Sequence, residues 1–145
     1  MISSTYKGLP VTSIDDQAFL GCGNLASVTI PDSVTSISAS AFSGCSNLQF
    51  NEYGNAKYLG SKTNDYFALI ETKSKNFSSY TIHNDTKIIA NSAFSDCDSL
   101  TSITFNGTVE EWNAIEKGGS WNENIPAEKS FARTGKWLCK RIKNQ

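Results

Sequence analysis

The stretch VTSIDDQAFLGCGNLASVTIPDS, residues 11–33, decides the fold, because the chain repeats it. A second copy, VTSISASAFSGCSNLQF, begins 23 residues later at Val34, and a third, TKIIANSAFSDCDSLTSITFNGT, covers residues 86–108. A period of this length is typical of solenoids, in which each repeat buries its apolar edge against its neighbours. The sequence therefore predicts a β-rich solenoid built of 23-residue coils with short strands.

The copies carry the same apolar residue types at equivalent positions, which predicts ladders of like side chains in the core. Strand alternation turns Val28 and Ile30 inward, and Ile103 and Phe105 in the third copy. Earlier in the first copy, a short stretch at Ala18 and Phe19 predicts a single helical or 3₁₀ turn. The equivalent sets are Ile14, Ile37 and Ile89; Ala18, Ala41 and Ala93; Phe19, Phe42 and Phe94; Cys22, Cys45 and Cys97; and Leu25, Leu48 and Leu100.

The second copy is interrupted. Its pattern fails after Leu48 and resumes at Tyr80, so we expect the second coil to comprise residues 34–50 continued at residues 80–85, with an insertion at about residues 51–79. The insertion contains two β-like runs, Lys57–Leu59 and Tyr66–Thr72, joined by a turn-rich link. We interpret it as a hairpin that leaves the solenoid.

Both ends depart from the repeat. Residues 2–10 are interpreted as the end of a preceding coil. After Phe105, the sequence Thr108-Val109-Glu110-Glu111 is a capping box, which predicts a short helix that ends near Gly118 and covers the open end of the stack. A last hairpin with its turn at residues 133–136 completes a cap over residues 109–145. The whole chain, residues 1–145, is expected to form one domain.

Charge is distributed unevenly along the chain. Residues 1–128 hold seven Lys and Arg against fourteen Asp and Glu, a net charge of −7, whereas residues 129–145 hold six basic residues and no acid, a net charge of +6. A solvated basic tail explains this pattern, and so would an anionic partner such as nucleic acid. No apolar run is long enough to span a membrane, and the N-terminus lacks the pattern of a signal peptide.

Motifs of catalysis and cofactor binding are absent from the sequence: it has no P-loop, GxGxxG, HExxH or CxxC. His83, the only histidine, lies in a predicted turn. The cysteines at positions 22, 45 and 97 occupy a core position of the repeat and are expected to form a buried column of free thiols. We therefore expect no enzyme activity, no cofactor and no metal.

The motif VTSIxxxAFxGCxNLxSVTIPxS at residues 11–33, together with the ending FNGTVEEWNAIEKGGSW at residues 105–121, resembles the BspA-like leucine-rich repeat family. The resemblance implies a right-handed solenoid with short parallel strands. It also implies a surface or secreted location, a role in adhesion or protein binding, and no catalytic residues.

The sequence thus favours a non-catalytic protein-interaction or adhesion module. The alternative is a structural subunit of a larger assembly, such as a coat, appendage or virion, with self-association through the basic tail; nucleic acid is a less favoured partner. The outward strand positions carry small hydroxyl side chains, so the candidate contact residues lie where the repeat fails. They are Tyr58, Tyr66, Phe67, Arg133, Lys136, Trp137 and Arg141.

Overall fold

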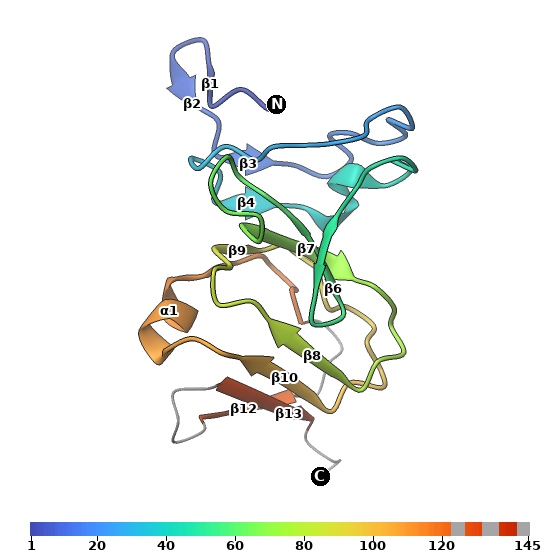
Figure 1. Ribbon diagram of the computed structural model, residues 1–145, viewed down its shortest axis with the longest axis vertical. Helices are drawn as coiled ribbons and strands as arrows, with labels where there is room; N and C mark the ends of the chain where they lie inside the picture. Colours follow the sequence, from blue (N-terminus) through green and yellow to red (C-terminus); the bar gives the residue numbers. More distant parts are fainter. Residues whose placement is uncertain (123–126, 132–136, 142–145) are drawn as a thin grey trace.

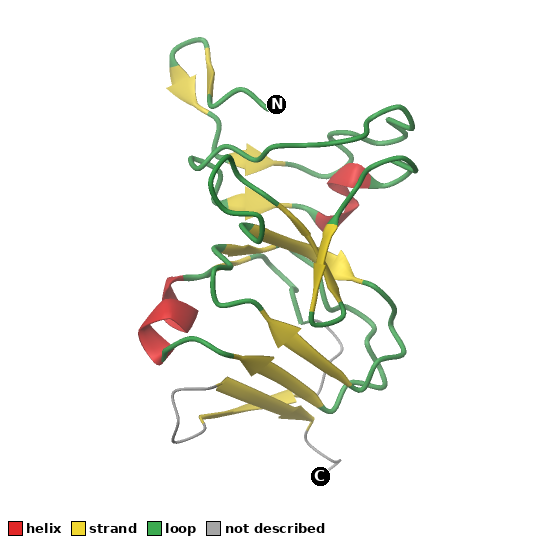
Figure 2. Cartoon of the chain, in the orientation of Figure 1, coloured by secondary structure: helices red, strands yellow, loops and turns green. Residues whose placement is uncertain are grey.

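The computed structural model describes residues 1–122, 127–131 and 137–141, and its strands are stacked along one long axis (Figure 1). Strands and loops dominate, with little helix (Figure 2). The elements are β1 (Thr5–Tyr6), β2 (Leu9–Pro10), β3 (Ser13–Ile14), β4 (Ser36–Ile37), a 3₁₀ turn (Ala39–Phe42), β5 (Asn51–Tyr53), β6 (Ala56–Leu59), β7 (Ala68–Thr72), β8 (Ser79–Ile82), β9 (Ile88–Ile89), β10 (Ser102–Phe105), α1 (Val109–Ala114), β11 (Glu116–Lys117), β12 (Ala127–Phe131) and β13 (Trp137–Arg141).

Parallel pairs join the repeats. Strand β3 pairs with β4, β7 pairs with β9, and β9 pairs with β11. On the other side of the repeat, β8 pairs with β10 in parallel register, with Tyr80 opposite Ile103 and Ile82 opposite Phe105. The strands predicted within Tyr66–Thr72 and around Ile103 and Phe105 are confirmed, and the pairs are parallel, as the resemblance implies. Strand β11 lies where the helix was expected to continue toward Gly118.

The insertion forms the expected hairpin but does not leave the stack. Strands β6 and β7 are antiparallel, yet β7 also pairs in parallel with β9, so that Leu69 lies opposite Ile89. Residues 68–82 therefore supply one strand to each side of the stack. The reason is visible in the sequence: the run Ala68-Leu69-Ile70 is apolar without interruption, which suits a strand that is buried on both faces.

A further hairpin, which was not predicted, joins β5 to β6. Gly54 and Asn55 form its two-residue turn, and both have positive φ angles, +55° and +69°. This turn rests on β8: Thr81 N–H donates to the Gly54 carbonyl at 3.1 Å, and the Asn55 amide donates to the Ser79 carbonyl. The hairpin therefore covers Thr81, one of the strand positions that carry a hydroxyl side chain.

The first copy departs from the prediction on one side. Residues 26–30 form no regular strand, although Ile30 is fully buried and donates its N–H to the Gly60 carbonyl. Above this segment, Ile2 N–H donates to the Thr29 carbonyl, which agrees with its interpretation as the end of a coil. Residues 5–10 then form the exposed hairpin of β1 and β2.

The capping box is confirmed, because Thr108 and Glu111 exchange side chain–backbone hydrogen bonds at the start of α1. Gly118 is not the helix stop, since α1 ends at Ala114. A Cβ on Gly118 would lie 2.3 Å from the Asn91 nitrogen, so glycine there permits close backbone approach. In Figure 1, α1 lies beside the stack, while β13 pairs antiparallel with β10 and carries β12 at the edge.

Candidate functional site

Each copy of the repeat contains the sequence Ala-Phe-x-x-Cys-x-x-Leu, and we name these segments the first turn (residues 18–25), the second turn (41–48) and the third turn (93–100). The first and second turns stack directly: the rings of Phe19 and Phe42 are 5.3 Å apart and nearly parallel. Backbone N–H groups of Phe19 and Gly21 donate to the carbonyls of Ala41 and Ser43, both at 2.8 Å. The third turn instead has Trp121 as its neighbour, with Phe94 N–H donating to the Trp121 carbonyl.

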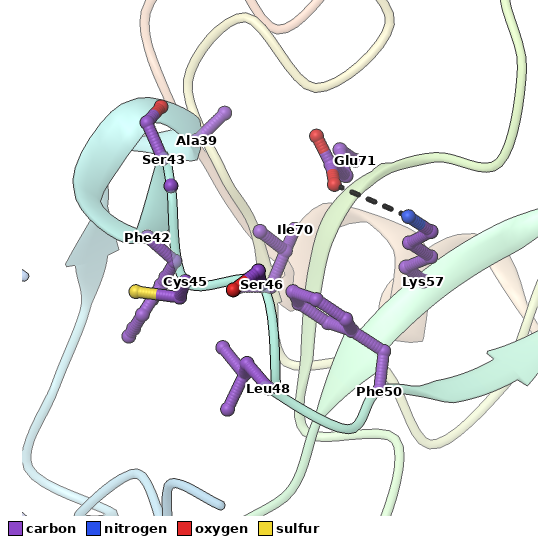
Figure 3. Close-up of a pocket in the computed structure, with 11 residues that line it drawn as sticks. Ala39, Phe42, Ser43, Cys45, Ser46, Leu48, Phe50, Lys57, Ile70 and Glu71 are labelled. Carbon is purple, nitrogen blue, oxygen red and sulfur yellow. Dashed lines mark ion pairs between the residues drawn. The ribbon is translucent and has the colours of Figure 1, made fainter. Parts of the chain in front are cut away.

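No turn of this type faces the other side of the second turn in the described residues. Strand β7 occupies that level, and the residues after it, 73–78, lack the Ala-Phe-x-x-Cys-x-x-Leu pattern. A hollow of about 420 Å³ remains, which we name the second-turn hollow. Figure 3 shows Phe42, Cys45 and Leu48 on one side of it and Phe50, Lys57 and Glu71 on the other.

The second-turn hollow has an apolar floor and a charged rim. Ile70 and Leu48 are buried beneath it, and Lys57 Nζ lies 3.6 Å from Glu71 Oε1 at the rim and 5.4 Å from the centre of the Phe50 ring. Cys45 Sγ donates to the Phe19 carbonyl, so the thiol faces the first turn. The hollow therefore combines an apolar floor with a partly exposed ion pair at its rim.

A second hollow, of about 540 Å³, lies where the link between β6 and β7 meets the turn after β8. We name it the aromatic hollow. Asn64 ties the two segments together, because its amide donates to the Asp85 carbonyl at 2.8 Å while its Oδ1 accepts from Tyr66 N–H. Its lining residues are Lys62, Thr63, Asn64, Asp65, Tyr66, His83 and Asp85.

The wall of the aromatic hollow is made of packed rings. The Tyr66 ring stacks on His83 with centroids 4.1 Å apart, and Tyr53 and Tyr58 contact these rings edge-on. Tyr58 is fully buried, and its hydroxyl accepts from His83 N–H; burial raises its pKa to about 12, so the phenol is neutral at physiological pH. Tyr58 is therefore a supporting residue behind the wall.

Charge in the aromatic hollow is net negative. It carries the carboxylates of Asp65 and Asp85 against the single ammonium of Lys62. Asp85 Oδ2 lies 3.8 Å from His83 Nδ1, and that nitrogen accepts the Asp85 N–H at 3.0 Å. Acceptance at Nδ1 leaves the ring proton of a neutral imidazole on Nε2. The hollow thus presents two carboxylates beside a donor.

Among the predicted contact residues whose side chains the structure describes, only Tyr66 lines one of the two hollows. Tyr58 and Phe67 are buried in the core and are not available to a partner, which corrects their assignment. The reason is that the insertion is part of the stack, so its aromatic residues fill the interior. Arg133 and Lys136 lie outside the described residues. Trp137 and Arg141 are the first and last residues of β13. His83 and Asp65, which line the aromatic hollow, were not among the predicted residues.

The cysteine column is corrected in part. Cys22, Cys45 and Cys97 are free thiols, but Cys22 is exposed whereas Cys45 and Cys97 are buried. The first turn has a neighbour on one side only, which uncovers its cysteine. In the described part of the chain, no group of His, Cys, Asp and Glu side chains is arranged to hold a metal ion, and no helix is long and apolar enough to cross a membrane.

This difference in burial predicts different reactivities. With iodoacetamide under native conditions, the peptide that contains Cys22 should be alkylated at least about tenfold faster than those with Cys45 and Cys97, because the buried thiols require local opening that costs at least about 1.4 kcal/mol. Mass spectrometry of timed digests measures the rates. Alkylation in denaturant, where the three should react alike, is the control. Equal native rates would contradict the structure.

Comparison with known proteins gives one match. Residues 71–115 match the family model described as BspA type Leucine rich repeat region (6 copies). The matched segment runs from the end of β7 through the third turn to the end of α1. No curated protein and no solved structure matches the chain.

Proposed function

Because residues 71–115 match the model of the BspA-type leucine-rich repeat region, we propose that this chain is a non-catalytic protein-interaction or adhesion module. We propose that it acts at a cell surface or after secretion. Repeats of this family generally serve as interaction modules. The observation that carries the proposal is the aromatic hollow. Its wall of packed rings and its two carboxylates form a preorganised contact site for a protein partner.

The charge of the hollow indicates which side chain of a partner would bind there. A guanidinium is planar, always charged and able to donate to two carboxylates, and arginine is common among interface hot spots. Asp65 and Asp85 offer acceptors at the hollow, while Tyr66 adds a polar aromatic edge. An arginine side chain on the partner therefore fits this site better than an acidic or apolar one.

The test uses small probes and the full chain. N-acetyl-arginine amide, titrated into ¹⁵N-labelled protein at low salt, should shift the amide resonances of residues 62–66 and 83–85. N-acetyl-citrulline amide, which has nearly the same shape without the charge, should not. The Asp65→Asn/Asp85→Asn double variant should bind the arginine probe at least about tenfold more weakly, because a charge-assisted hydrogen bond contributes about 1.5–3 kcal/mol.

Asp15→Asn is the matched control, since Asp15 is exposed and lies outside the hollow. Equal shifts with both probes, or equal binding by the double variant and the control, would refute the site. A structural subunit is the second candidate function, and the uncovered first turn supports it.

A further inference from the structure

The chain contains both an unfilled position in its ladder and an unused turn that matches it. The second turn lacks a stacked neighbour on one side, at the second-turn hollow. The first turn lacks a neighbour on the opposite side: Cys22 and Ala18 are exposed there, and Leu20 has 54% of its surface exposed. Because both turns have the Ala-Phe-x-x-Cys-x-x-Leu pattern, each supplies what the other lacks.

The backbone groups are complementary in the same sense. In the observed stack, Gly21 N–H of one turn donates to the carbonyl of Ser43 in the next. Gly44, which corresponds to Gly21, has an N–H with no acceptor among the described residues, and it lines the second-turn hollow. Leu20, which corresponds to Ser43, has a carbonyl that accepts no hydrogen bond in the same part of the chain.

We propose that the first turn of one copy docks in the second-turn hollow of a second copy, so that the protein self-associates. The contact continues the packing already seen between the first and second turns, with Gly44 N–H donating to the Leu20 carbonyl of the incoming copy. It places apolar side chains of the incoming turn over Phe42, Leu48 and Ile70. The Lys57–Glu71 pair lies at the rim with both side chains partly exposed, so the incoming turn covers the apolar floor rather than these two charges.

The two surfaces lie on different parts of the molecule, since the first turn is at the N-terminal end of the stack and the hollow is on the far side of the second turn. The contact is therefore heterologous: after pairing, one copy keeps its hollow free and the other keeps its first turn free. Such a contact generates chains of copies at high concentration. This outcome goes beyond binding at the aromatic hollow and does not depend on it.

Two full-length variants separate the surfaces. Leu20→Glu places a carboxylate on the incoming turn, and Ser46→Arg places a long cation at the exposed lining of the hollow. Sedimentation velocity over a range of concentrations should show the wild-type protein growing in mass with concentration. Each variant alone should remain monomeric.

An equimolar mixture of the two variants is the decisive experiment. The Leu20→Glu copy retains an intact hollow and the Ser46→Arg copy retains an intact first turn, so the mixture should form a dimer and stop there. Phe77→Glu, at an exposed apolar position outside both surfaces, is the control and should associate like the wild type. Circular dichroism of each variant verifies folding. A wild-type protein that stays monomeric up to millimolar concentration, or variants that still self-associate, would overturn the proposal, and so would a mixture that stays monomeric.

Discussion

Replacing Phe94 with alanine is expected to lower the free energy of unfolding by about 3–5 kcal/mol, among the largest effects of any single truncation in this chain. Its ring is fully buried, and it contacts Tyr80 at 5.3 Å and Trp121 at 6.0 Å between ring centroids. Tyr80 and Trp121 come from opposite neighbours of the third turn. Loss of the Phe94 ring therefore leaves a cavity, which the surrounding segments cannot fill because their own packing holds them in place.

Urea unfolding followed by circular dichroism measures the effect. Phe42→Ala should cost about 3 kcal/mol, at the low end of the range, because Phe42 stacks on Phe19 but also borders an open hollow. Phe77→Ala is the matched control and should cost less, since 38% of Phe77 is exposed. Native stability in the Phe94 variant would show that the equivalent phenylalanines do not form the core.

Replacing Gly54 with alanine is expected to cost about 3–4 kcal/mol, the sum of a left-handed backbone penalty and a steric collision. Gly54 has a φ angle of +55°, and a Cβ there would lie 2.1 Å from the Thr81 carbonyl oxygen. That oxygen belongs to the backbone of β8 and cannot rotate away. The variant must therefore lift the hairpin of β5 and β6 off the sheet.

Gly8→Ala separates the two contributions. Gly8 also has a positive φ angle, +78°, but no atom lies within 4 Å of the position that its Cβ would take. It should therefore cost only about 1–2 kcal/mol, the backbone penalty alone. The two variants are compared by chemical denaturation. Equal losses in the two proteins would mean that the hairpin does not rest on β8.

The periodic parts of the fold are predictable because their cause is local. The equivalence of Phe19, Phe42 and Phe94 reveals the turns, and the spacing of Thr108 and Glu111 reveals the capping box. The hairpin of β5 and β6 was missed although Gly54-Asn55 is a recognised two-residue hairpin signal. The interpretation of Gly118 as a helix stop failed because only the folded backbone shows how closely Asn91 approaches it.

The candidate site was less predictable, since its residues meet only through tertiary contacts. Tyr66 was identified as an aromatic residue outside the repeat, but nothing in the sequence indicates that it stacks on His83. Tyr58 and Phe67 are also aromatic residues outside the repeat, but they are buried. The presence of an aromatic residue in the insertion does not show whether its side chain faces the core. The second-turn hollow could have been inferred from residues 73–78, which lack the pattern of a turn.

The bridge between Ser38 and Asn91 has a consequence for how the chain folds. Here the second copy pairs directly with the third, and the Asn91 side chain also accepts the Ala39 N–H, while the chain between them forms β5 to β8. A regular repeat array can fold by adding one neighbour at a time, since each contact is local in sequence. The contact between Ser38 and Asn91 instead closes a long loop, and the entropy lost in closing it is offset only after the contacts around it have formed. We therefore expect slower folding and a single cooperative transition for residues 34–121.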